Sequence, residues 1–213
     1  MLALQAARKI GAANIGGELR VALITLLERE NVVVADAARR GVPLDTYESP
    51  EFIAHLSRFV AELRDPRAIP ALAEAIYGGG TVARALAAFG EQSVPAVTRV
   101  VAAPDVHYDV VNHALLTLRF VLEGQTPVSS STRNQIRESA ALRLTGKQYF
   151  TTLWKAMDLA ITLNDPSLRA IVQTIASDRG QILARGISDP EVIARTQRLA
   201  VERLAGVPAL PRR

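Results

Sequence analysis

Two of the three histidines in the chain lie close together, between Asp105 and His113. Asp109 and His113 are four residues apart and would share one face of a helix that starts near His107. Two imidazoles and a carboxylate can bind a divalent metal ion. The same residues also fit an ordinary helix start, with Asp105 as the N-cap and His113 bonded to Asp109. We favour the helix start and predict no metal site.

Two other short motifs have residue types found in active sites. Gly78-Gly79-Gly80 lacks the Lys and Ser or Thr of a phosphate-binding loop and has no strand before it, so it reads as a turn between helices. Ser129-Ser130-Ser131 has no neighbouring His or acid that would activate a hydroxyl. The chain has no cysteine, which excludes thiol nucleophiles and disulfides. We predict no catalytic residue, no cofactor and a protein that is not an enzyme.

Basic residues gather in the second part of the chain. The net charge of +4 divides into −2 over the first 123 residues and +6 over the rest. Arg133, Arg137, Arg143, Lys147 and Lys155 cluster in sequence, and Arg133 and Arg137 would share a helix face. Together with Tyr149, Trp154 and Arg169 they could line a cationic groove for nucleic acid. However, Trp154 and Phe150 fall in an apolar stripe and are expected in the core. Nucleic-acid binding is therefore an alternative function and not the first choice.

Helix starts recur along the chain as Ser-Pro or Asp-Pro pairs. Ser or Asp can cap a helix, and Pro at the first helical position loses nothing by lacking an N–H. Apolar residues spaced by three or four follow each pair, as after Ser49-Pro50. The other pairs are Asp65-Pro66, Asp165-Pro166 and Asp189-Pro190.

The apolar periodicity predicts eight to ten helices and no strand. Thr132 is the expected cap of one helix, after a polar loop at 125–131. The predicted segments include helices over 66–77, 91–102, 106–123, 132–144 and 165–177, with a short turn over 181–184.

The first 48 residues are harder to interpret. Leu19 to Leu27 predicts a helix, which we expect to be covered on two faces because Val21 and Ile24 lie away from its main stripe. Asn31 to Arg40 is also predicted as a helix, although its run of three valines favours a strand. No apolar run reaches the roughly 20 residues that cross a membrane, so we predict no membrane span. The charges at Arg8 and Lys9 follow a brief apolar start, unlike a secretory signal, and a cytoplasmic location is expected.

A repeat of 25 residues links two of the helices. Ala68-Ile69-Pro70-Ala71-Leu72 matches Ser93-Val94-Pro95-Ala96-Val97, and a short helical period is typical of stacked-repeat proteins. Antiparallel helices that pair and stack would remove every apolar stripe from water. The sequence therefore predicts an all-α fold, an α-solenoid of four to five stacked helix pairs.

The same region resembles a known family. Residues 65–76 resemble the second helix of a HEAT repeat, and residues 82–90 the first helix of the next repeat, which 94–97 complete. The pattern is similar to the short HEAT-like variant also seen in phycobiliprotein lyases. It is clear over residues 50–122. It is weak over 149–177, where Arg replaces the later Pro.

The resemblance implies a right-handed superhelix and one domain over residues 1–213. Residues 1–48 would be capping helices, and residues 178–213 a C-terminal cap with a frayed tail. In the family, most members bind other proteins, and a few bind or modify nucleic acid or pigments. The second helix of each unit lines the concave side. Carried over to this chain, that side gives the expected partner-binding residues Arg67, Glu74, Arg99, Arg133, Arg137, Arg143, Arg169 and Gln173.

The favoured function is a non-catalytic scaffold that binds a protein or peptide on its concave face. Glu74 and Arg99 occupy the same repeat position, so they could form an ion pair or part of a polar binding stripe. The first alternative is a solenoid that binds polyanions or nucleic acid, as HEAT-like DNA glycosylases do, through its basic C-terminal half. A relative of the chromophore lyases is a third possibility, which rests on the resemblance alone.

Overall fold

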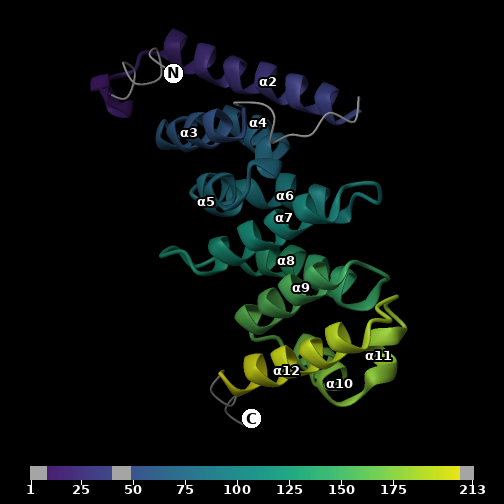
Figure 1. The fold of residues 1–213 in the computed structure, drawn as a ribbon. Coiled ribbons are helices and arrows are strands. Elements are labelled where there is room, and N and C mark those ends of the chain that lie inside the picture. The colour runs from purple at the N-terminus through teal and green to yellow at the C-terminus, as the bar shows by residue number, and fades with distance from the viewer. Residues whose placement is uncertain (1–8, 40–48, 207–213) are drawn as a thin grey trace.

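The computed structural model describes residues 9–39 and 49–206, and this part of the chain is helical with no strand (Figure 1). The all-α prediction is confirmed for these residues. None of their helices is both long enough and apolar enough to span a membrane. The 3-10 helices are η1 Ala12–Asn14, η3 Pro66–Ala68, η4 Ala75–Gly78 and η5 Gly90–Ser93. The α-helices are α2 Gly17–Arg39, α3 Ser49–Glu62, α4 Ile69–Glu74, α5 Gly80–Ala87, α6 Val94–Ala102, α7 Tyr108–Leu122, α8 Ser130–Thr145, α9 Phe150–Leu163, α10 Pro166–Ser177, α11 Arg179–Leu183 and α12 Pro190–Ala205.

The helices lie in two rows. Helices α3, α5, α7, α9 and α12 contact one another in that order and form the first row, and α4, α6, α8 and α10 form the second. Between the rows, α6 packs on α7, α8 on α9, and α10 on α12. Helix α2 lies against both α3 and α4 at one end of the stack, and α10, α11 and α12 form the other end (Figure 1).

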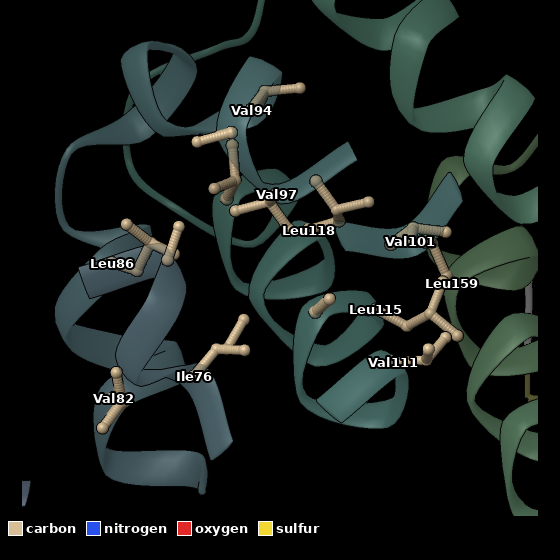
Figure 2. Close-up of a cluster of buried hydrophobic side chains, with 14 of the residues drawn as sticks. Ile76, Val82, Leu86, Val94, Val97, Val101, Val111, Leu115, Leu118 and Leu159 are labelled. Atoms are coloured by element: carbon tan, nitrogen blue, oxygen red, sulfur yellow. The ribbon is translucent and has the colours of Figure 1, made fainter. Parts of the chain in front are cut away.

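The core between the rows is built from small and aliphatic side chains. Figure 2 shows one cluster, to which η4, α5, α6, α7 and α9 all contribute. Leu86, Val97 and Leu118 are fully buried there. Burying a side chain of this size stabilises the fold by about 1.5–3 kcal/mol. With few aromatic rings in the chain, the rows are joined mainly by interlocking Leu, Ile, Val and Ala.

The Asp-Pro pairs begin helices as the sequence predicts. Asp165 Oδ1 accepts hydrogen bonds from the backbone N–H groups of Ser167 (2.9 Å) and Leu168 (3.1 Å) at the start of α10. Asp189 makes the equivalent bonds at the start of α12. Asp65 caps η3 by accepting from the N–H of Arg67. These bonds satisfy N–H groups that the first helical turn leaves without partners.

The helix predicted over 66–77 is not continuous, and the one predicted from residue 91 begins later. The first divides into η3, α4 and η4, and the second begins as η5 and becomes α-helical at Val94. Pro70 and Pro95 explain where α4 and α6 begin, because each lacks an N–H and therefore fits only the first turn of an α-helix. Each is the second residue of its helix, so the two copies of the repeat share one local structure.

Several predicted boundaries were wrong. Ser129 and not Thr132 caps α8, because Thr132 is buried and bonds the carboxylate of Glu91 at 3.0 Å. His107 and not Asp105 caps α7. The predicted loop at 125–131 ends inside α8, and the turn at 181–184 belongs mostly to α11.

The predictions for the N-terminal region were partly wrong. Helix α2 is one continuous helix where two were expected. Ile24 belongs to the same buried stripe as Leu23 and Leu27, while Val21 is 45% exposed, so α2 is covered on one side only. A position at the end of the stack gives a helix one layer of neighbours. The predictions for residues 1–8, 40–48 and 207–213, including the frayed tail, lie outside the described residues.

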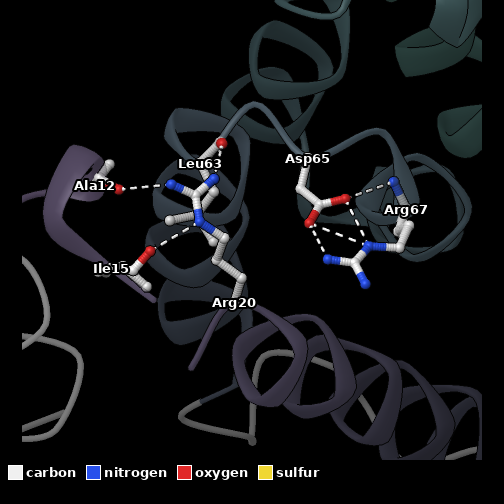
Figure 3. A network of polar contacts seen from close by, with 6 residues as sticks. All are labelled: Ala12, Ile15, Arg20, Leu63, Asp65 and Arg67. Carbon is white, nitrogen blue, oxygen red and sulfur yellow. Dashed lines mark hydrogen bonds and ion pairs between the residues drawn. The ribbon is translucent and has the colours of Figure 1, made fainter. Parts of the chain in front are cut away.

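Arginines hold neighbouring helices together at the ends of helices. Arg20 on α2 donates to the carbonyls of Leu63 (2.6 Å), Ile15 (2.9 Å) and Ala12 (3.2 Å), as Figure 3 shows. The C-terminal carbonyls of a helix lack intrahelical partners and carry partial negative charge, so a guanidinium satisfies both needs. Six arginines within the described residues donate to a carbonyl at or near the C-terminal end of another helix: Arg20, Arg64, Arg133, Arg143, Arg169 and Arg185.

Candidate binding site

A cavity of about 680 Å³ lies at the end of the stack, between α2, the α4–η4 segment and the start of α7. We call it the α2–α7 cavity. Val32 is 64% exposed and Glu74 is also exposed, which places the mouth of the cavity at the surface. The described lining residues are Asn31, Val32, Val34, Ala35, Glu74, Tyr77, His107, Asp109 and Val110.

The inner wall of the α2–α7 cavity is held by a buried amide. Asn31 is 5% exposed, and its Nδ2 donates to the carbonyl of Ala71 at 2.8 Å. The hydroxyl of Tyr77 donates to Asn31 Oδ1 at 3.1 Å. These bonds join α2 to α4 and η4, and they satisfy polar groups whose burial would otherwise cost about 1–3 kcal/mol each. The wall is therefore fixed in place before any ligand arrives.

The polar groups at the rim of the α2–α7 cavity are mainly acidic. Glu74 and Asp109 line it with exposed carboxylates, and no Lys or Arg is found among its described lining residues. Burial raises the pKa of the Tyr77 hydroxyl well above its usual value, and the negative charges of Glu30 and Glu74 raise it further. The phenol therefore stays a neutral hydrogen-bond donor, and the cavity is apolar with a negative edge.

The two histidines considered for metal binding have different surroundings. His107 Nδ1 accepts from the N–H of Asp109 at 3.4 Å and lies 3.8 Å from its carboxylate. His113 is half-buried, 3.9 Å from the place where a Cβ on Gly79 would lie. Burial lowers the pKa of His113, and its expected bond to Asp109 is not present. Within residues 9–39 and 49–206, no three His, Asp or Glu side chains come together to share an ion.

A line of rings leads from the α2–α7 cavity along the first row. His107 is 4.2 Å from Tyr108 between ring centroids, and Tyr108 stacks on Tyr149 at 4.1 Å. The line continues through Phe150 to Trp154, whose indole N–H donates to Thr196. Arg195 covers the indole at 4.7 Å. Phe150 and Trp154 pack against the core, as predicted, but they are only half-buried there. Tyr149 is exposed.

Some of the predicted partner-binding residues make hydrogen bonds or ion pairs within the described part of the fold, and others do not. Arg143 donates to the carbonyls of Val101 and Ala103, Arg133 to that of Leu163, and Arg169 to that of Leu204. These three arginines hold helix ends in the fold. Arg67 pairs with Asp65 at 2.6 Å (Figure 3), and Gln173 is exposed on α10. Arg137 is half-buried on α8 and helps to lower the pKa of Asp165.

The expected ion pair between Glu74 and Arg99 is not formed. Arg99 Nε donates to the carbonyl of Pro95 in its own helix at 3.3 Å. Arg99 lines a shallower groove of about 370 Å³ between α6 and α8, whereas Glu74 lines the α2–α7 cavity. Of the eight predicted residues, only Glu74 reaches that cavity.

No protein-family model, curated protein or solved structure matches the chain.

Sequence reasoning did not select most of the cavity residues. Asn31 carried a signal that could have found it, because it continues the buried stripe of Leu23, Leu27 and Val34 yet is polar. A buried amide in an apolar stripe needs hydrogen-bond partners and therefore marks a specific contact. Nothing in the sequence indicates that Val32 lies near His107, because that contact depends on how α2 crosses the end of the stack.

Proposed function

We propose that the chain is a non-catalytic helical-repeat scaffold that binds a peptide segment of a protein partner. The observation that carries this function is the α2–α7 cavity. Its volume of about 680 Å³ falls within the roughly 300–1,000 Å³ of known ligand sites. Its valines offer an apolar pocket, and recognition of a chain segment commonly uses such a pocket for an anchoring side chain.

The proposed architecture is an α-solenoid of HEAT-like repeats. The two rows of helices support it, as do the matching breaks at Pro70 and Pro95, 25 residues apart. Glu74 belongs both to the cavity and to the outer side of the second row. A partner that lies along α4, α6 and α8 would therefore reach the cavity at one end.

The nucleic-acid alternative has weaker support. Arg133, Arg143 and Arg169 belong to the basic half of the chain, and all three donate to carbonyls inside the fold. Arg143 is half-buried, and its pKa is lowered by that burial. These three arginines therefore contribute to holding neighbouring helices together.

The test is selection of a displayed library of random short peptides on the full chain. Val32→Trp should block the mouth of the α2–α7 cavity and abolish capture of the selected peptides. Val33→Trp is the matched control, because Val33 is the next residue on α2, is 47% exposed and does not line the cavity. Capture that survives Val32→Trp, or a library from which nothing is enriched, contradicts the proposed function.

A further inference from the structure

The chain as a whole is basic, but among the described residues that line the α2–α7 cavity the acidic side chains are Glu74 and Asp109, and none is Lys or Arg. Glu74 comes from α4 and Asp109 from the first turn of α7, so carboxylates reach the rim from two different elements. Glu30, on the helix that supplies Val32 and Val34, is close enough to raise the pKa of the Tyr77 hydroxyl. His107 is the one other titratable group among the described lining residues besides Tyr77, and it is exposed beside Asp109.

The carboxylates and the valines lie at different depths. Asn31 and Val34 are buried at the inner wall, while Glu74 and Asp109 are exposed. An apolar group that enters between Val34 and Val110 would leave the next part of its chain at the acidic edge. Burial of that group supplies affinity, at about 25 cal/mol per Å² of apolar surface removed from water. The charges at the edge discriminate between partners, since a negative group there would be repelled.

We propose that the α2–α7 cavity recognises a peptide segment in which a Leu-like or aromatic side chain is flanked by Lys or Arg. The apolar side chain occupies the pocket lined by Val32, Val34 and Val110, and the cation lies against Glu74 and Asp109. This inference rests on the proposed function and names the chemistry of its partner. The charge complementarity at the rim selects this occupant over an acidic or neutral segment.

The neutral hydroxyl of Tyr77 and the amide of Asn31 fit the same picture. Each already has a partner inside the protein, at 3.1 Å and 2.8 Å, so neither calls for a strong polar group deep in the cavity. The inner wall therefore accepts an apolar side chain without leaving a buried polar atom unsatisfied. Polar recognition is left to the rim.

The experiment uses the peptides selected on the full chain, together with synthetic copies in which Lys or Arg is changed to Gln. We expect the selected sequences to carry Lys or Arg next to Leu, Ile, Met or Phe. Glu74→Gln should weaken their binding by about two- to fivefold, the range for an exposed ion pair. Asp109→Asn should act in the same direction. Glu202→Gln, an exposed change on α12 at the other end of the stack, should have no effect.

A double-mutant cycle locates the contact. If the peptide cation lies against Glu74, replacing that Lys or Arg by Gln should weaken binding only slightly in the Glu74→Gln variant. Raising the salt concentration should weaken the Lys peptide and leave its Gln copy almost unchanged.

The outcomes separate this inference from the proposed function. One result would overturn the inference and leave the proposed function intact. In that result the selected peptides lose binding in Val32→Trp, but they carry no Lys or Arg, or Glu74→Gln does not change their binding. Peptides whose binding survives Val32→Trp, or the absence of any selected peptide, overturn both. Circular dichroism of each variant confirms that the helices are retained.

Discussion

The arginine contacts between helices make a quantitative prediction, for which Arg143 is the best test. Its guanidinium is half-buried and donates to the carbonyl of Val101 through Nε (2.9 Å) and Nη2, and to that of Ala103 (3.2 Å). Both carbonyls belong to the C-terminal end of α6, and Val101 is fully buried. In Arg143→Met the aliphatic contacts persist, but the carbonyls lose their donors.

The expected loss follows from these contacts. A hydrogen bond from a charged donor contributes about 1.5–3 kcal/mol, and the cost of burying the guanidinium offsets part of the total. We therefore expect Arg143→Met to lower the free energy of unfolding by about 2–3 kcal/mol. For a chain of this length that corresponds to a fall in Tm of about 4–12 °C. Arg143→Lys keeps the charge but cannot reach both carbonyls with a planar fork. Its free energy of unfolding should therefore lie between those of the unchanged chain and Arg143→Met.

Urea unfolding followed by circular dichroism measures the effect. Arg99→Met is the matched control, because Arg99 is exposed on α6 and bonds only Pro95 in its own helix. It should change the free energy of unfolding by about 0.5 kcal/mol or less. If the two methionine variants unfold at the same urea concentration, arginines at helix ends do not hold neighbouring helices together, and our explanation of the basic half is wrong.

Three further predictions follow from local features. Gly79 has φ +88° and ψ −159°, so Gly79→Ala should cost about 1–3 kcal/mol of unfolding free energy, while Gly80→Ala within α5 should be neutral or stabilising by thermal denaturation. Burial alone would raise the pKa of Asp165, but hydrogen bonds from Ser167 and Leu168 outweigh it and hold the pKa below its usual 3.8. Stability from the Asp165 charge is therefore present above that value and lost as pH falls through the lower folded pKa. We expect Asp165→Asn to lower the free energy of unfolding at pH 7 and to lower it less in acid. For duplex DNA, fluorescence anisotropy should show weak binding with a log–log salt slope of about 2 or less in magnitude, and a slope of several units would restore the nucleic-acid alternative.

Much of the local structure could be predicted from the sequence. Asp165 and Asp189 cap helices because an Asp-Pro pair favours a helix start with little help from elsewhere. The apolar stripes identify most of the core, including Leu115 and Leu118. Errors occurred where two neighbouring signals competed, as at Ser129 and Thr132. There the choice of cap depends on Glu91, 41 residues before Thr132 in the sequence.

The long-range contacts and the candidate site were less predictable, because their parts come from distant segments. Arg143 reads as a basic surface residue in sequence, and only the position of α6 gives it carbonyl partners 40 and 42 residues away. The α2–α7 cavity likewise depends on the path of α2 across the end of the stack. Glu74 was selected for its place in a repeat and reached the site, although the partner expected for it, Arg99, lines another groove.

The central claim is that a peptide segment binds in the α2–α7 cavity, and methyl NMR tests it most directly. The full chain, with labelled valine and leucine methyl groups, is titrated with a peptide selected on it. We predict that the largest shifts belong to Val32, Val34 and Val110, which line the cavity. Shifts centred instead on Leu142, in the groove between α6 and α8, would contradict the claim, as would a titration that leaves every methyl signal unmoved.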